Sequence, residues 1–322
     1  TPNGILFFQS KTIVLSTGCR ERTSKQIFLQ GTRPYGVMTA GQAQALINLY
    51  GVIPGKKAII LGSGDIGLIM ARRLTLSGVN VEGVYEVKPT PSGLSRNIFQ
   101  CLNDYDIPLY LSTTVKEVYG NDRLTGVSVY QVDSNGKYID DTKRYIDCDL
   151  LILSVGLIPE NELGLSLGVK IDKNTHGPLC DNNFETTISG IYTCGNATHV
   201  NDLVDYVSLS AEICARAISS SIDNDYLNKP AIKIMVSQFG KILYALPHYI
   251  NANANHDFVD FYFRPKQIMK KAIVSVMIDG TYAYKETVYN LNPSEMKIIT
   301  VNCQNIKVTS VITFKLEEES EK

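Results

Sequence analysis

Short apolar runs separated by turn residues open the chain. The runs over 4–8 and 12–16 predict two strands. Thr39, with Gln42 three residues later, fits a capping box, and Gly51 supplies a stop, so a helix is predicted between them. Strand-like and helix-like segments in succession are typical of an α/β fold.

From residue 57 the pattern predicts one complete βαβ unit. The apolar run 58–61 is typical of a buried strand, and the 65–77 segment that follows is typical of an amphipathic helix. The predicted apolar stripe of that helix consists of Ile66, Ile69, Met70 and Leu74. A second strand is predicted over 81–87, and the three elements have the order and length of a βαβ unit.

Further helices and strands are predicted in the middle of the chain. They are a helix over 94–105, strands over 115–119, 124–132, 137–146, 149–155 and 190–194, and a helix over 203–219. Asn135 and Gly136 predict a hairpin turn within the strand-rich part.

After Pro230 the pattern changes to evenly spaced strands. These strands are predicted over 232–239, 258–263, 272–278, 285–289, 297–301 and 308–314. Alternating apolar and polar positions at this spacing predict a small antiparallel β-sandwich, immunoglobulin-like in style, over 230–322.

Composition and charge exclude several classes of function. Among 322 residues, 31 basic and 32 acidic ones leave a net charge of -1, so no basic face for nucleic acid is expected. The 7 cysteines form no C-x-x-C pair, which argues against a zinc site, and no metal site is predicted. No apolar run is long enough to cross a bilayer and no signal peptide is recognisable, so we expect a cytoplasmic protein without membrane contact.

A glycine-rich turn links the strand and helix of the predicted βαβ unit. Residues 62–67 match G-x-G-x-x-G, and Glu86 ends the next strand, as a dinucleotide fingerprint requires. Gly62 permits the tight turn, Gly64 lets the backbone approach a pyrophosphate, and Gly67 lets the helix pack close to the strand. The predicted NAD-binding residues are Gly62, Ser63, Gly64, Asp65, Ile66, Gly67 and Glu86. The alternative is a glycine turn that binds nothing.

Glu86 bears on the choice between NAD and NADP. Its carboxylate is predicted to accept hydrogen bonds from the adenosine ribose and to repel a 2′-phosphate, which favours NAD. Lys88, two residues further on, acts against this preference. A solvated carboxylate at a strand end is the alternative interpretation of Glu86.

Two further segments resemble a known family. The stretch from Thr12 to Arg22, which contains TGCRER, resembles the strand and "ATG" segment of the pyridine nucleotide-disulfide oxidoreductase superfamily. Residues 190–196, GIYTCGN, resemble its late flavin motif. With GSGDIGLIMARRL and GNATHVNDLVDYVS, the stretch 12–219 is similar to FAD-dependent dehydrogenases that include the large subunits of sarcosine and opine oxidases. It is also similar to FAD/NAD dehydrogenases associated with glycerol-3-phosphate metabolism.

The resemblance implies an α/β fold in which a Rossmann-like NAD-binding domain is inserted into a partial FAD-binding domain, with the β-sandwich at the C-terminal end. The expected domains are a partial FAD-binding domain at 1–53 and 156–225, an NAD-binding domain at 54–155 and a sandwich at 230–322. The implied FAD contacts are Thr17, Gly18, Gly195, Asn196, Asp202, Leu203 and Val204, and Gly156 is implied to lie where the nicotinamide half approaches.

Three departures from the family pattern limit the implied chemistry. The family's own N-terminal G-x-G-x-x-G is not found, because fewer residues precede Thr12 than the roughly 30 of a βαβ unit. The redox-active disulfide is missing, and Asn196 stands where most relatives have Asp. We therefore expect FAD binding to be weak or absent in a chain truncated in this way. Cys194 is expected to be a packed strand residue and His199 a spectator, and no catalytic residue is assigned.

The sequence thus predicts a flavin-dependent NAD(H) oxidoreductase, or a fragment of one, that passes hydride between NAD(H) and FAD to an unidentified acceptor. Full turnover is expected to require the missing N-terminal segment. One alternative is a non-catalytic protein that binds NAD or docks a partner, and another is a pseudoenzyme that keeps only the scaffold. The expected partners are the dinucleotide cofactors, with a second oxidoreductase subunit or self-association.

Overall fold

The computed structural model describes residues 4–223, 233–252, 258–304 and 306–319. Contacts within the chain form two compact units. The middle unit is Arg20–Ile158, and the terminal unit joins Thr1–Cys19 to Pro159–Lys322. The chain passes between the units at β2 (Cys19–Glu21) and β12 (Leu157–Pro159), and these two strands pair with each other.

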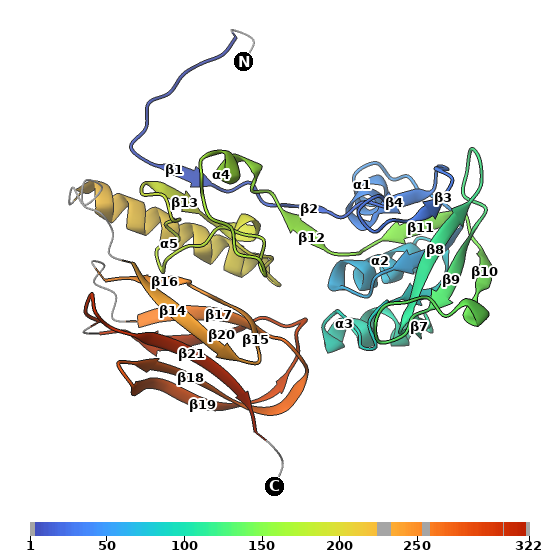
Figure 1. Ribbon diagram of the computed structural model, residues 1–322. Helices are drawn as coiled ribbons and strands as arrows, with labels where there is room; N and C mark the ends of the chain where they lie inside the picture. Colours follow the sequence, from blue (N-terminus) through green and yellow to red (C-terminus); the bar gives the residue numbers. More distant parts are fainter. Residues whose placement is uncertain (1–3, 224–232, 253–257, 305, 320–322) are drawn as a thin grey trace. The chain divides into compact units, whose positions relative to one another are not determined.

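The middle unit contains a five-stranded parallel sheet in the order β4-β11-β5-β6-β7 and a four-stranded sheet in the order β10-β9-β8-β3 (Figure 1). The strands of the parallel sheet are β4 (Val37–Thr39), β5 (Lys57–Leu61), β6 (Asn80–Tyr85), β7 (Leu109–Tyr110) and β11 (Leu150–Leu153). The other strands are β3 (Gln30–Gly31), β8 (Thr113–Tyr119), β9 (Gly126–Gln131) and β10 (Arg144–Asp147). The helices are α1 (Ala40–Asn48), α2 (Asp65–Leu76) and α3 (Ser95–Cys101), with short 3-10 turns at Asn103–Tyr105 and Asp140–Thr142.

Both faces of the parallel sheet are covered, as its continuous apolar strands require. On β5, Ala58 and Ile60 pack into the cluster formed with α1, α2 and α3, whereas Ile59 and Leu61 pack toward β8 and β9. The glycine turn leaves this sheet at the C-terminal end of β5 and is therefore attached to a strand that is buried on both sides.

The predicted βαβ unit is confirmed by β5, α2 and β6, and Thr39 caps α1 by accepting a hydrogen bond from the Gln42 N–H at 3.4 Å. The predicted stripe of α2 is partly wrong, because Ile66 and Ile69 are exposed. The buried face of α2 instead consists of Gly67, Leu68, Met70, Ala71 and Leu74. These positions follow a helical repeat of three and four residues, which leaves Ile66 and Ile69 on the flank of the buried face.

The terminal unit begins with a parallel pair, β1 (Ile13–Leu15) and β13 (Ile191–Thr193), in which Ile13 lies opposite Ile191. Its helices are α4 (Glu162–Ser166), a 3-10 turn at Gly195–Ala197 and α5 (Val204–Asp223). The strand predicted over 4–8 is not formed. No described strand pairs with that segment, and Phe7 stays 94% exposed, so the apolar run has neither a ladder nor a core to pack into.

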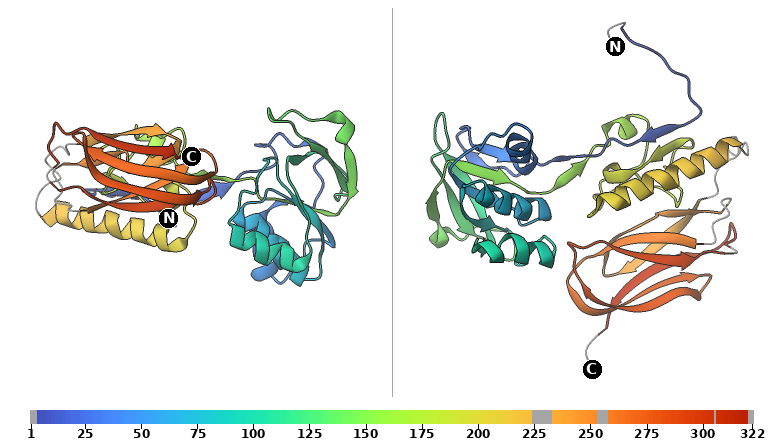
Figure 2. Two further views of the ribbon diagram at one scale, coloured as in Figure 1. Left: turned by 90° about the horizontal axis from the view of Figure 1, so that it is seen from below. Right: turned by 180° about the vertical axis from the view of Figure 1, so that it is seen from behind.

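The C-terminal part is a two-sheet sandwich, as predicted (Figure 2). One sheet has the order β16-β14-β21-β18-β19 and the other β15-β17-β20. The strands are β14 (Lys233–Gly240), β15 (Ile242–Leu246), β16 (Tyr249–Asn251), β17 (Phe258–Pro265), β18 (Met269–Ile278), β19 (Thr281–Leu291), β20 (Lys297–Asn302) and β21 (Ile312–Glu318). All pairings between these strands are antiparallel except that of β14 with β21, which is parallel. The pattern missed the short strands β15 and β16, which flank Pro247.

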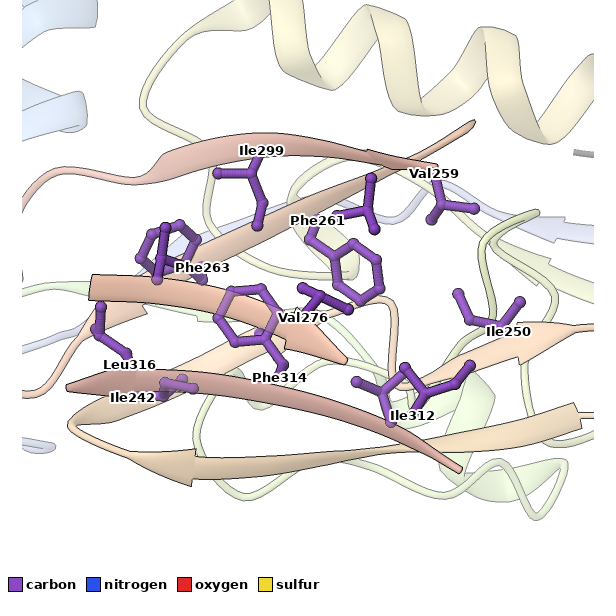
Figure 3. Packing of buried hydrophobic residues seen from close by; sticks show 14 of the residues in the cluster. Ile242, Ile250, Val259, Phe261, Phe263, Val276, Ile299, Ile312, Phe314 and Leu316 are labelled. Carbon is purple, nitrogen blue, oxygen red and sulfur yellow. The ribbon is translucent and has the colours of Figure 1, made fainter. Parts of the chain in front are cut away.

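Three phenylalanines fill the core between the two sheets (Figure 3). The ring of Phe314 lies 5.6 Å from that of Phe261 and 5.3 Å from that of Phe263, measured between centroids. All three side chains are fully buried. Aromatic side chains bury more apolar area than any others, so this cluster contributes strongly to the stability of the sandwich.

The outer face of the β15-β17-β20 sheet is buried as well. It carries Tyr244, Leu246 and Tyr262, which pack with Cys214 of α5 and with Tyr192 of β13. The two halves of the terminal unit therefore share one apolar cluster. The expected boundary between the partial FAD-binding domain and the sandwich lies at 225–230, outside the described residues, and the three-domain division stays a prediction.

A buried ion cluster also joins these halves. The Lys233 ammonium on β14 lies 3.0 Å from Glu185 Oε2 and 3.4 Å from Asp181 Oδ2. Burial raises the pKa of Asp181 to about 6, although the Lys233 charge acts in the opposite direction. Protonation of Asp181 below this pH therefore favours the folded state.

Two buried histidines have the opposite effect on stability at low pH, because their protonation favours the unfolded state. His248 donates its backbone N–H to the Cys180 carbonyl at 2.9 Å and accepts a hydrogen bond at Nδ1 from the Cys180 N–H at 3.3 Å. Burial lowers the pKa of His248 to about 4 and the pKa of His199 to about 3, the latter with help from the Arg264 charge. Because an unfolded histidine titrates near pH 6.5, the folded state binds fewer protons below that pH and loses stability.

We predict that His248→Gln reduces the loss of stability on acidification. Between pH 7 and pH 5 the parent should lose about 1 to 2 kcal/mol more than the variant, because the parent has two buried histidines that are protonated on unfolding in this window and the variant keeps only His199. Urea unfolding at both pH values measures the difference. His176→Asn, at an exposed position, is the control. An identical pH dependence in parent and His248→Gln would contradict the assignment.

Candidate functional site

The glycine turn forms where β5 ends and α2 begins. Gly62 has a φ of 100°, and a Cβ there would lie 2.0 Å from the Ser154 carbonyl oxygen. A Cβ on Gly67 would lie 2.5 Å from the Gly62 carbonyl oxygen and 2.9 Å from Ser154 Cβ. These two glycines are therefore required by the packing of the turn against the segment after β11, whatever the turn binds.

Gly64 differs from its neighbours in the turn. It caps α2 with a φ of -65°, which any residue can adopt, and a Cβ there would meet nothing within 4 Å. Neither its conformation nor its packing thus explains a glycine. α2 has no side-chain cap, so its first N–H groups and the positive end of its dipole face the space that a Cβ on Gly64 would enter. An anionic ligand group fits this arrangement.

Glu86 lies beside the turn, one residue beyond β6. Its Oε2 accepts hydrogen bonds from the Ser63 N–H at 3.1 Å and the Ser63 hydroxyl at 2.6 Å, and its Oε1 accepts one from the Lys88 N–H at 3.0 Å. The side chain is almost completely buried. A carboxylate has about four acceptor positions, so three bonds leave room for one more donor on Oε1.

Asp65 holds a neighbouring loop rather than facing the turn. Its Oδ1 accepts hydrogen bonds from the Leu94 N–H at 2.8 Å and from Asn97 Nδ2 at 2.7 Å. Ser63 Oγ accepts a further one from the Ser92 N–H at 2.9 Å. The turn is thereby tied to the 92–97 segment at the start of α3. Ile66 is 39% exposed and lies outside the core.

Gly156 lies in the same unit, three residues beyond β11. Its φ is 99°, and its carbonyl accepts a hydrogen bond from the Arg22 N–H at 3.0 Å. A Cβ there would meet nothing within 4 Å. The structure thus brings Gly62–Gly67 and Glu86 together at the C-terminal edge of the parallel sheet and places Gly156 in the segment that leaves this edge beyond β11.

The proposed flavin residues of the terminal unit gather at another sheet edge. Thr17 and Gly18 follow β1, Gly195 and Asn196 follow β13, and the two strands are parallel, so both pairs lie at the same end. The Thr17 hydroxyl donates to the Glu160 carbonyl at 2.5 Å, and the Asn201 N–H donates to Asn196 Oδ1 at 3.0 Å. Both side chains thus already have partners within the protein.

Asp202, Leu203 and Val204 open α5. Leu203 and Val204 are exposed, whereas the Asp202 carboxylate is paired with Arg264 of β17 and accepts a hydrogen bond from the Met296 N–H at 2.7 Å. The Gly195 N–H donates to Ser210 Oγ at 2.8 Å, which fixes the loop after β13 to α5. Sequence patterns did not indicate Arg264 or Ser154, because their partners are distant along the chain.

Cys194 and His199 are both buried, which agrees with the interpretation of Cys194 as a packed residue. Burial raises the pKa values of Cys194 and Cys214, the latter to about 12, so both thiols stay protonated near neutral pH. The His199 ring packs against the rings of Tyr244 and Tyr262. Within the described residues, no group of three or more His, Cys, Asp or Glu side chains could hold a metal ion. In the same part of the chain, every helix is too short or too polar to span a membrane.

Comparison with known proteins supports the resemblance seen in the motifs. Residues 7–218 match the family model described as pyridine nucleotide-disulphide oxidoreductase. One of the subunits of opine oxidase from Agrobacterium tumefaciens is 24% identical over 204 residues, which are 60% of this chain and 40% of that protein. The HcnB subunit of hydrogen cyanide synthase from Pseudomonas aeruginosa is 32% identical over 175 residues, 49% of this chain and 37% of that protein. The chain spans less than half the length of either relative.

Among solved structures, thioredoxin reductase of T. acidophilum superposes with a TM-score of 0.54 at 22% identity, covering 68% of this chain and 67% of that one. A likeness at this identity concerns the fold alone. It supports the Rossmann-like α/β architecture.

We predict that Gly64→Val folds normally and loses affinity for NADH by at least about tenfold, because the new side chain fills the space in front of α2. Gly64→Ala should show a smaller loss. Fluorescence titration with NADH measures affinity, and the thermal midpoint reports folding. Leu76→Ala, at the exposed last residue of the same helix, is the control. Unchanged NADH affinity in a folded Gly64→Val protein would contradict the assignment of the turn.

Proposed function

The chain belongs to the pyridine nucleotide-disulphide oxidoreductase family, and from this premise we propose that it is an oxidoreductase that binds NAD(H) at the turn Gly62–Gly67 and exchanges hydride with FAD. Electrons would then pass to an acceptor that is not identified. The observation that carries the proposal is the open space beside Gly64, where a Cβ would meet no protein atom within 4 Å at the start of a helix that has no side-chain cap.

The residues of the turn fit the pyrophosphate of NAD. Gly62 and Gly67 shape the turn, and Gly64 leaves the space in front of the uncapped helix α2 open. The first N–H groups of α2 would donate to the phosphate oxygens, and the helix dipole would stabilise their charge. Gly156, with a positive φ and an open side, would leave room for the nicotinamide half.

Glu86 would select NAD over NADP. The remaining acceptor position on Oε1 suits one ribose hydroxyl, whereas a 2′-phosphate offers no donor and repels the carboxylate. Since Ser63 and Lys88 also bond Glu86, the carboxylate is held in one orientation. Its position is therefore set before the ribose binds.

We predict that the parent binds NADH more tightly than NADPH and that Glu86→Gln narrows the difference by about tenfold, the value of a hydrogen bond to a charged group. Titrations with both nucleotides measure the ratio. Glu82→Gln, on the same strand but paired with Lys57 at the surface, is the control. A parent that binds NADPH more tightly than NADH would refute the role of Glu86 and would indicate Lys88 as the partner of the 2′-phosphate.

The residues of the terminal unit leave fewer free polar groups for FAD than the glycine turn leaves for NAD. The sequence carries one G-x-G-x-x-G, which is the NAD turn. The side chains of Thr17, Asn196 and Asp202 already bond protein partners. The Gly18 carbonyl and the Gly195 N–H bond protein partners as well, so FAD would depend on backbone groups at the first turn of α5. When both are bound, the nicotinamide and flavin rings supply the hydride chemistry, and the protein orients them.

We predict that the protein of this sequence does not retain FAD after incubation in excess and desalting. The physical reason is that the polar side chains expected at the flavin are engaged within the protein. An absorbance spectrum of the desalted protein measures retention. A stoichiometric flavin band would show that the backbone groups suffice, and the proposal of weak binding would then be wrong.

An NAD-binding subunit that works beside a flavin-bearing partner is the second candidate. The pairing of the flavin-side polar groups favours it, and so do the names of the relatives, which are subunits of opine oxidase and hydrogen cyanide synthase. Saturable NADH binding by a protein that does not retain FAD would support this candidate.

A further inference from the structure

Arg264 connects the β-sandwich to the segment that leads into α5. The residue lies near the end of β17, and its side chain is only 12% exposed. Its Nε donates to the Tyr244 hydroxyl at 2.9 Å, and one terminal nitrogen donates to the Pro293 carbonyl at 3.3 Å. The other terminal nitrogen donates to the Val200 carbonyl at 3.4 Å and is paired with Asp202. One guanidinium thus bonds oxygen atoms from four separate residues.

The same segment is held at two more points. The Met296 N–H donates to the second carboxylate oxygen of Asp202 at 2.7 Å. His199 Nδ1 lies 3.5 Å from the Tyr244 hydroxyl that also accepts from Arg264. Residues 199–202, between the late flavin motif and α5, are therefore fixed by side chains and backbone of the sandwich.

Only an arginine can satisfy this arrangement. The guanidinium presents five donors in a rigid plane, whereas a lysine presents three donors from a single point. The alternation of side chains along β17 sets the position of Arg264. The preceding residue, Phe263, is buried in the sandwich core, so Arg264 points to the opposite face of the sheet. The register of β17 therefore determines where the guanidinium meets Asp202.

We propose that Arg264 is a positioning residue, which sets the conformation of residues 199–204 and, through them, the first turn of α5 that meets the flavin. The inference rests on the proposed function for its flavin part. The proposal gives the β-sandwich a role in shaping the proposed flavin site, which lies in the other half of the terminal unit. The physical basis is the set of hydrogen bonds from Arg264 to Val200, Asp202, Pro293 and Tyr244.

Charge gives Arg264 a second effect on the same turn. The Asp202 carboxylate lies two residues before α5 and is only 16% exposed, so removal of the Arg264 cation would leave an uncompensated, largely buried negative charge beside the first turn of the helix. Arg264 neutralises this charge and, together with the Met296 N–H, holds the carboxylate in one orientation. Loss of the guanidinium would thus disturb both the geometry and the electrostatics of the turn.

The test compares Arg264→Gln, Arg264→Lys and Asp202→Asn with the control Arg216→Gln, which removes an arginine of α5 that is 76% exposed and bonds Glu212 at 3.0 Å. Hydrogen exchange measured by mass spectrometry reports the local stability of every segment. Flavin fluorescence titration gives the dissociation constant of FAD, and NADH titration reports the site of the middle unit. If Arg264→Gln does not fold, Arg264→Lys and Asp202→Asn carry the test.

We predict that Arg264→Gln speeds exchange in residues 199–206 by at least about tenfold and raises the FAD dissociation constant by about tenfold or more, with unchanged NADH affinity. For Arg264→Lys, the exchange rate and the FAD dissociation constant should lie between those of the parent and Arg264→Gln. For Arg216→Gln, both should equal those of the parent. Exchange in 199–206 that equals the parent, or that rises equally across β14–β21, would overturn the positioning role. If the parent binds no FAD, the flavin part of the proposed function fails, and the localised exchange still decides whether Arg264 fixes the segment.

Discussion

Burial of strands on both faces is the constraint on which both units depend. In the middle unit, β5 packs against helices through Ala58 and Ile60 and against a second sheet through Ile59 and Leu61. In the terminal unit, the β15-β17-β20 sheet packs its inner face into the sandwich core and its outer face against α5. A strand with two covered faces cannot slip by one residue, because every side chain would change its environment. The turns and loops at the ends of such strands are therefore fixed in position as well.

The glycine turn shows that the glycines of one motif can lie in different physical environments. A Cβ on Gly62 would clash with the Ser154 carbonyl oxygen, and a Cβ on Gly67 would clash with the Gly62 carbonyl oxygen, so a side chain on either would displace backbone. Gly64, between them, has ordinary dihedral angles and an empty neighbourhood. The three glycines of one motif therefore have different physical causes. Two maintain the packing of α2 on the sheet, and the third leaves open space at the start of α2. In the terminal unit, by contrast, polar side chains that motif comparison places near a flavin hold the protein itself together, as the pairing of Asp202 with Arg264 shows.

The sequence by itself determined the elements whose signals are local. The strand 58–61, the helix that follows it and the capping of α1 by Thr39 depend on residues close together along the chain, and the structure bears them out. Apolar periodicity and glycine spacing act over a few residues, so a pattern along the chain is enough to recognise them. The same holds for most strands of the sandwich.

Only the tertiary structure decided the features that depend on distant partners. The apolar run 4–8 has the pattern of a strand, yet it forms none, because no described strand pairs with it. Ile66 and Ile69 are exposed because the rotation of α2 about its axis, which packing on the sheet sets, buries Leu68, Met70 and Leu74 instead. The bonds from Arg264 to Asp202 and the buried environment of His248 join residues far apart in sequence. Packing between such residues is set by the register of whole sheets, and no local pattern carries that information.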